Sequence, residues 1–316
     1  MQLYPSIKSI YEKNTFSITT KKTPLTPSLV AMLQEELSDK PFIQEKLQAL
    51  FRQPHFITLS EASFQLHYIP IRELTQKRMK QVFHRLLVVS KVLQIKKPIQ
   101  IWFLPCKVDR YFPKGEVVQP IHINGGYTYT YQDKIYVYRY EEFPKVFLHE
   151  LLHNSILHLD MWKKEYLMLL YKAFDIDTTS CETSCSTRLV PNEAIVEAWA
   201  IMFHIACISI EKQIPLQILY NLEMSHNLSM SHRLWKYQQE VYPEWKEETH
   251  SYSYIRLKTC ILYFWKKFEI LSYPYDDITL TTFFLKYNKK PEFLKQIKKT
   301  SLPTTNTFQM TCTGNQ

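Results

Sequence analysis

Two histidines and a glutamate stand within five positions of an otherwise apolar run, KVFLHELLHNSIL, at residues 145–157. They form the pattern H-E-x-x-H, with His149, Glu150 and His153. Positions i and i+4 of an α-helix lie on one face, so both imidazoles can offer Nε2 to one ion. Glu150 lies about 100° further round the helix, where its carboxylate can reach a water on that ion. The spacing therefore predicts two zinc ligands and a general base.

The residues around this pattern favour a buried site. The flanking positions are bulky and uncharged: Val146, Phe147, Leu148, Leu151 and Leu152. A buried carboxylate beside two imidazoles is costly unless a metal or hydrogen-bond partners compensate it. The alternative is a surface helix with a chance histidine pair, which does not explain the apolar flanks.

A third ligand is expected downstream, because a catalytic zinc ion usually has three protein ligands and one open position. The segment PNEAIVEAWA, residues 191–200, supplies Glu193 and Glu197 at i and i+4 of another predicted helix. One carboxylate can bind the metal, and the other can accept the Nδ1–H of a ligand histidine and fix its tautomer.

These two motifs together resemble the thermolysin-like gluzincin metallopeptidases. In that family the helix after H-E-x-x-H carries N-E-x-x-x-D, whose glutamate binds zinc and whose aspartate supports a zinc-binding histidine. The resemblance implies that Glu193 is the third ligand and that Glu197 stands in the place of the aspartate. Because this chain has the longer glutamate there, both assignments stay open, with Glu193 favoured.

The elements around the motif are predicted from the spacing of apolar residues. Met79, Val82 and Phe83 recur at helical spacing after Thr75, which can cap the helix. Alternating β-branched and aromatic residues indicate strands. Residues 25–53 suggest one or two helices. Thereafter we expect a strand at 64–71, a helix at 76–94, three strands at 99–105, 123–131 and 134–140, and the H-E-x-x-H helix at 141–159. Glu141 and Glu142 stand at the start of this last helix.

This order predicts an α+β fold. The gluzincin resemblance implies a zincin-like arrangement, with a small mixed sheet, a backing helix and the H-E-x-x-H helix, followed by a mainly helical C-terminal lobe. We expect a helical N-terminal region at 1–60, the N-terminal lobe at 61–160, and the C-terminal lobe with the third ligand at 161–300. Residues 301–316 are polar and aperiodic, which predicts a disordered tail.

Other parts of a peptidase site are less clearly marked. The resemblance implies an edge strand that pairs with extended substrate, and Asn124, Gly125 and Gly126 fit it because glycine lets a backbone approach closely. A glycine pair is also an ordinary turn. The residue that would stabilise the oxyanion is not identifiable among five candidates: His226, His232, His250, Tyr252 and Tyr254. His158 is most simply structural, as is His204.

Composition bounds the class of protein. The chain has 316 residues, 45% hydrophobic and 22% charged, which is typical of a soluble globular protein. We find no apolar stretch approaching the ~18 residues that span a bilayer, and no signal-peptide core, so we expect an intracellular, cytoplasmic protein without a membrane partner. The layout is also similar to predicted metallopeptidase-like proteins of large DNA viruses, which implies a virion as a second location.

Charge and cysteines suggest two weaker hypotheses. The net charge is +9, and residues 284–300 hold six lysines against Glu292 alone. A solvated basic face explains this more simply than nucleic-acid binding, for which no motif is present. Cys181 and Cys185 form a C-x3-C pair, which we interpret as a plain loop rather than a second zinc site.

The sequence thus predicts a Zn2+-dependent metallopeptidase that acts on a peptide or protein substrate, with Glu150 as general base. The main alternative is a catalytically inactive protein of the same fold, structural or virion-associated, whose basic surface binds a partner or nucleic acid. The substrate, the choice between endopeptidase and exopeptidase, and the oligomeric state stay open.

Overall fold

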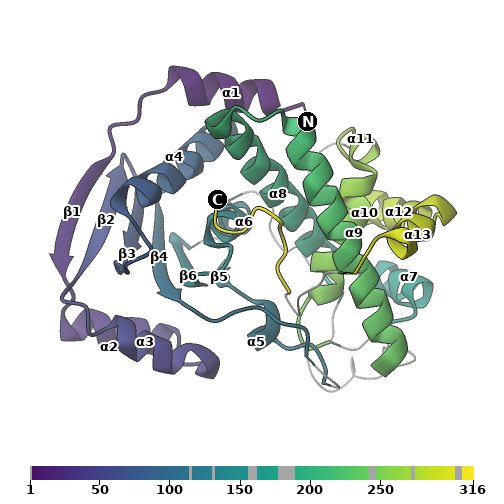
Figure 1. Cartoon of the computed structure of the whole chain (residues 1–316), viewed down its shortest axis with the longest axis horizontal. Coiled ribbons are helices and arrows are strands. Elements are labelled where there is room, and N and C mark those ends of the chain that lie inside the picture. Colours follow the sequence, from purple (N-terminus) through teal and green to yellow (C-terminus); the bar gives the residue numbers. More distant parts are fainter. Residues whose placement is uncertain are drawn as a thin grey trace.

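The computed structural model places a mixed sheet in one half of the molecule and a group of helices in the other (Figure 1). It describes most of the chain, in these ranges: 2–113, 116–129, 132–155, 162–176, 189–241, 247–271, 275–302 and 308–316. The prediction of an α+β fold with a small mixed sheet is confirmed. Cys181, Cys185 and His158 lie outside the described residues.

The sheet has six strands in the order β1-β2-β3-β4-β6-β5. The strands are β1 (Thr19–Pro24), β2 (His55–Glu61), β3 (Phe64–Tyr68), β4 (Ile99–Cys106), β5 (Gly126–Thr128) and β6 (Lys134–Arg139). Strands β3, β4 and β6 run parallel, and the other pairs are antiparallel. The short strand β5 is therefore an edge strand.

Helices cover both faces of the sheet because its central strands alternate apolar side chains between the two faces. In β4, Phe103 packs with the core that includes α4 (Gln76–Val92) and α6 (Phe143–Ser155). Trp102 packs on the opposite face, in a smaller core with α2 (Pro27–Glu36) and α3 (Gln44–Leu50). Helix α6, which carries the H-E-x-x-H pattern, is thus held against the sheet.

The described part of the C-terminal half is helical. Its elements are α7 (Lys164–Phe174), α8 (Pro191–Lys212), α9 (Leu216–Val241), a π-helical turn η3 (Ser253–Leu257), α10 (Lys258–Tyr263), α11 (Trp265–Phe268), α12 (Asp277–Tyr287) and α13 (Pro291–Lys299). Helix α8 packs against α6, α9, α10 and η3. It is therefore the element that joins the two halves at the level of the motif.

Helix α8 corrects the prediction that no stretch is long and apolar enough to span a membrane. It contains an 18-residue window of mean hydropathy 1.6 with few charges. However, 89% of this window is buried inside the protein, as in the core helix of a soluble protein. Its apolar composition follows from packing on several sides rather than from a bilayer.

Most predicted elements between residues 62 and 160 are confirmed, including the helix capped by Thr75, whose Oγ1 accepts from the Arg78 backbone N–H at 3.2 Å. The prediction of a helical region at 1–60 is wrong for two segments. Residues 1–60 contain β1 and most of β2. They also contain α1 (Tyr4–Lys13), the 3-10 turn η1 (Pro41–Ile43) and the two helices over 25–53. Strand β1 is almost entirely exposed, so it carries no apolar alternation that could reveal it.

The prediction of a disordered tail at 301–316 is wrong for residues 308–316, which pack into the protein. Phe308 and Thr311 are fully buried, and Met310 is nearly so. This segment forms no helix or strand and is held by contacts with distant elements. A chain held in this way needs no periodic pattern, so its sequence resembles that of a disordered segment.

Candidate metal centre

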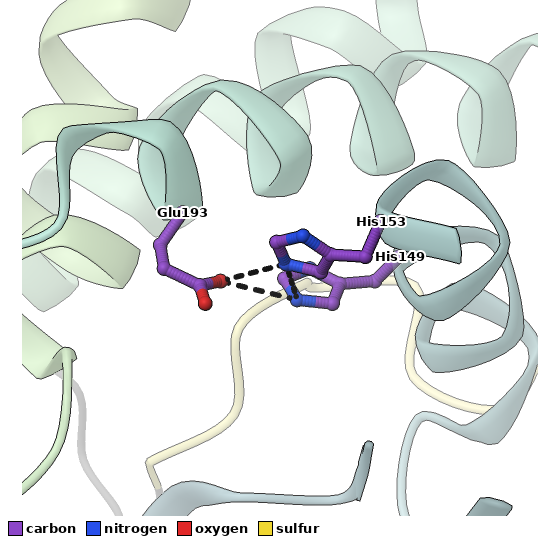
Figure 2. A group of neighbouring side chains, drawn as sticks. All are labelled: His149, His153 and Glu193. Atoms are coloured by element: carbon purple, nitrogen blue, oxygen red, sulfur yellow. Dashed lines mark hydrogen bonds and ion pairs between the residues drawn. The ribbon is translucent and has the colours of Figure 1, made fainter. Parts of the chain in front are cut away.

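Three side chains from α6 and α8 converge on one point (Figure 2). His149 and His153 lie one turn apart on α6, and their Nε2 atoms are 3.1 Å apart. Glu193 lies in the first turn of α8, which begins at Pro191. Its Oε2 is 2.9 Å from His153 Nε2 and 3.4 Å from His149 Nε2. All three residues are buried.

These residues fit a zinc ion. A tetrahedral zinc with ligand distances of about 2.0–2.2 Å holds its ligand atoms about 3.3–3.5 Å apart. The three observed separations, 2.9, 3.1 and 3.4 Å, come within a few tenths of this spacing. Two imidazoles and one carboxylate also form a donor set of known catalytic zinc sites. Burial opposes ionisation of Glu193, but His153 and His149 outweigh it and hold its pKa well below 4.5.

Glu197 lies behind the first histidine. Its Oε2 is 2.7 Å from His149 Nδ1, and its Oε1 accepts from Lys145 Nζ at 2.6 Å. Burial alone would raise the pKa of Glu197, but Lys145 and His149 lower it, so the carboxylate is ionised. A carboxylate at Nδ1 fixes the ring with Nε2 facing the metal position. Of the two glutamates, Glu193 therefore has the position of a ligand and Glu197 that of a supporting residue.

The pKa of His149 bears on metal binding. Burial favours the neutral imidazole, but hydrogen bonds to Glu193 and Glu197 outweigh it and raise the pKa to about 9. In the metal-free protein the ring is therefore protonated at neutral pH, and Nε2 donates toward Glu193. This proton occupies the position that a metal would take.

Zinc binding is accordingly expected to release a proton near pH 7. Because the pKa is raised, the imidazole stays protonated below about pH 9, and the apparent affinity for zinc should fall about tenfold per unit as the pH decreases from about 8 to about 6.5. Titration calorimetry in two buffers of different ionisation enthalpy measures this proton. An affinity that does not change over this range would contradict the assignment of His149 as a ligand.

A cleft opens beside His149. Its lining also includes Asn124, Gly125, Gly126, Glu150 and Glu197. Gly126 begins β5, and a Cβ added there would lie 2.8 Å from the Tyr136 carbonyl oxygen and 3.2 Å from Glu150 Oε1. Glycine at this position therefore avoids a clash with the backbone of β6 and leaves the Glu150 side chain uncrowded. Burial raises the pKa of Glu150, as suits a general base.

Among the five oxyanion candidates, the structure places Tyr254 in the cleft. It comes from η3, and its ring centroid is 5.9 Å from that of His149. Burial and the carboxylates of Glu193 and Glu150 raise the pKa of Tyr254 well above 10, so its hydroxyl remains a donor. His226 and His232 instead contact backbone carbonyl oxygens elsewhere.

Four further residues that line the cleft were not singled out from the sequence: Arg110, Ile123, Lys145 and Met310. Lys145 had a usable signal, because a lysine four positions before His149 lies on the same helix face. Arg110 lies in a loop, and Met310 lies in the segment predicted to be disordered. Neither has a fixed sequence spacing from the motif that could reveal it.

No family model, curated protein or solved structure matches this sequence. Inferences about function therefore rest on the residues of the site and their geometry.

Proposed function

We propose that this protein is a zinc-dependent metallopeptidase of the thermolysin-like gluzincin type. The observation that supports this most is the convergence of His149, His153 and Glu193 beside a cleft that contains Glu150. A structural zinc site would need no ionisable residue on the open side of the ion, and it usually has four protein ligands.

His149, His153 and Glu193 would hold the ion, with Glu197 orienting the first histidine. When bound, zinc lowers the pKa of a water to about 7 and polarises a carbonyl group. The chain would bind its substrate along β5, which pairs with β6 on one side. As the last strand of the sheet, β5 has a second edge that pairs with no strand in the described ranges, and an extended peptide can add there.

Glu150 would act as the general base. It takes a proton from the attacking water, whose oxygen bonds to the scissile carbonyl carbon, and it passes the proton to the leaving amine as the C–N bond breaks. The Tyr254 hydroxyl would donate to the carbonyl oxygen as negative charge develops there. The reaction is peptide hydrolysis without a covalent enzyme intermediate.

Metal analysis combined with a peptide library tests the proposal. We expect one zinc ion per chain, hydrolysis that stops with a chelator, and hydrolysis that returns when zinc is added. Mass spectrometry of the library reports the cleavage. Hydrolysis that resists the chelator would contradict the proposal, and bound zinc without hydrolysis would favour the inactive alternative.

A further inference from the structure

The C-terminal segment 308–313 supplies Met310 to one side of the cleft, and this end of the chain passes beside the site in Figure 2 (pale yellow). The Phe308 N–H donates to the Arg110 carbonyl oxygen at 3.2 Å, and the Phe308 ring stacks on Phe112 with centroids 3.9 Å apart. Met310 follows and lines the cleft itself. The segment is therefore fastened directly to the loop that carries Arg110.

Two buried carboxylates hold the backbone of this segment. Glu142 Oε1 accepts from the N–H groups of Met310 at 2.8 Å and Thr311 at 2.6 Å. Glu223 Oε1, on α9, accepts from the next two N–H groups, at 3.1 and 3.3 Å. Four successive N–H groups are thus bonded to buried side-chain oxygens, so the segment is held in place as a wall beside the cleft. Glu141 and Glu142 thus contact this wall and Arg110. The sequence predicts that they begin the helix, but α6 starts after them, at Phe143.

Arg110 lies beside this segment, and one of its donor groups has no hydrogen-bond partner among the described residues. Its Nε donates to the Ile123 carbonyl oxygen at 2.6 Å, and its Nη1 donates to Glu142 Oε2 at 2.8 Å. These bonds fix the guanidinium plane. Nη2 makes no hydrogen bond to a described residue, and it lies against Gly125, where an added Cβ would come within 2.6 Å of it. Because Arg110 also lines the cleft, Nη2 can donate to a bound ligand.

Lys145 adds a second cation to the cleft lining. It is 3% exposed, and its Nζ donates to Glu197. An ammonium group has three donors, so this bond leaves others for a ligand. Two cations therefore line the cleft beside the wall.

The two adjacent glycines limit the distance from Arg110 to the general base. A Cβ added at Gly125 would lie 2.6 Å from Arg110 Nη2, and one added at Gly126 would lie 3.2 Å from Glu150 Oε1. With about 3.8 Å between neighbouring Cα atoms and about 1.5 Å for each Cα–Cβ bond, the two atoms lie at most roughly 13 Å apart. One C-terminal residue and two contact distances fit within this limit.

We propose that the side of the cleft beside this wall binds the C-terminal carboxylate of a peptide, with Arg110 as its anchor and Lys145 assisting, so that the protein is a carboxypeptidase. This inference rests on the proposed metallopeptidase function. A substrate chain cannot continue past the wall, and a guanidinium with a free edge recognises a carboxylate. Water adds to the carbonyl carbon of the penultimate residue, the C–N bond breaks, and Glu150 delivers the proton to the amine. The products are a shortened peptide and one free amino acid.

Three acetylated tripeptides test the proposal that the C-terminal carboxylate is recognised. The first ends in alanine with a free carboxylate, the second ends in alanine amide, and the third ends in aspartate amide. We expect kcat/KM for the free acid to exceed that of both amides at least about tenfold, with release of alanine alone. Equal hydrolysis of the alanine amide would overturn the proposal while leaving metallopeptidase function intact. An aspartate amide as good as the free acid would do the same, because the recognised carboxylate would then belong to a side chain.

Binding to the zinc-loaded Glu150→Gln protein separates the subsite from catalysis. The free acid should bind at least about tenfold more tightly than the amide by calorimetry. If the unmodified protein hydrolyses no peptide but the variant binds the free acid more tightly, the carboxylate subsite is supported and the proposed catalytic function is wrong. Equal binding of the two peptides overturns the subsite, and this measurement needs no change at Arg110.

Variants of two buried arginines locate the anchor. Arg110→Lys should reduce the preference for the free acid at least about tenfold, because lysine cannot reproduce the guanidinium fork. Arg139→Lys is the matched control. Arg139 is also buried and holds the same loop through the carbonyl oxygens of Asn124, Val108 and Ile121, but it is not among the residues that line the cleft. A preference that survives Arg110→Lys overturns the assignment of the anchor.

Discussion

Glu150→Gln is expected to lower peptide hydrolysis by about 10²–10⁴-fold while the zinc content stays unchanged. Glutamine has nearly the same size and can still lie beside Gly126, so the cleft keeps its shape. It cannot accept a proton from water, which is the step proposed for Glu150. The Glu150 carboxylate is also outside the group formed by His149, His153 and Glu193, so replacing it by an amide leaves the ligand set complete.

Steady-state kinetics and metal analysis of the same preparation check this result. Glu73→Gln is a suitable control, because it makes the same chemical change in an exposed ion pair with Lys107, outside the cleft lining. It should retain full activity. If Glu150→Gln were as active as the unmodified protein, Glu150 would have no part in the mechanism, although the metal site could remain.

The second large effect concerns the two glutamates of α8. Glu193→Ala is expected to weaken zinc binding roughly 10²–10³-fold, the share of one ligand in a site whose total binding free energy is about 10–16 kcal/mol. Glu197→Ala is expected to cost about 10–100-fold, as for other residues that orient a ligand histidine. The difference follows from position, since Glu193 faces both Nε2 atoms and Glu197 faces His149 Nδ1.

Competition with a chelator of known zinc affinity measures both variants on one scale. Glu197→Gln is an additional comparison, because its amide oxygen can still accept from His149 Nδ1–H and should restore part of the lost affinity. If the order were reversed, with Glu197→Ala the weaker binder, Glu197 would be the ligand. Unchanged affinity in both variants would remove α8 from the metal site.

The sequence predicts the parts of the site that depend on spacing within one helix. His149, Glu150 and His153 lie in fixed relation on α6, and Glu193 and Glu197 do so on α8, because a helix has one repeat. The strands at the centre of the sheet are also predictable, since both of their faces are buried and their residues are therefore mostly apolar, β-branched or aromatic. Both kinds of signal are local and arise from regular backbone geometry.

The residues that complete the cleft are set by tertiary packing and are not predictable in this way. Tyr254 reaches the site from η3, about 100 residues after α6, and the sequence gives no reason to prefer it to Tyr252. Arg110 and Met310 are brought together through Glu142, and no repeat in the chain connects the three. Strand β1 was missed for a different reason, because an exposed edge strand has no buried face to mark it.

The chain contains four glycines, and two of them are the adjacent Gly125 and Gly126 beside the cleft. Bare backbone therefore forms this side of the opening, and no substitution there can make the residue smaller. Variation or engineering toward larger substrates must instead act on lining side chains that can be shortened, such as Met310. The two sides thus differ in evolvability. Substitution cannot widen the cleft at Gly125 and Gly126, but it can widen the cleft at Met310.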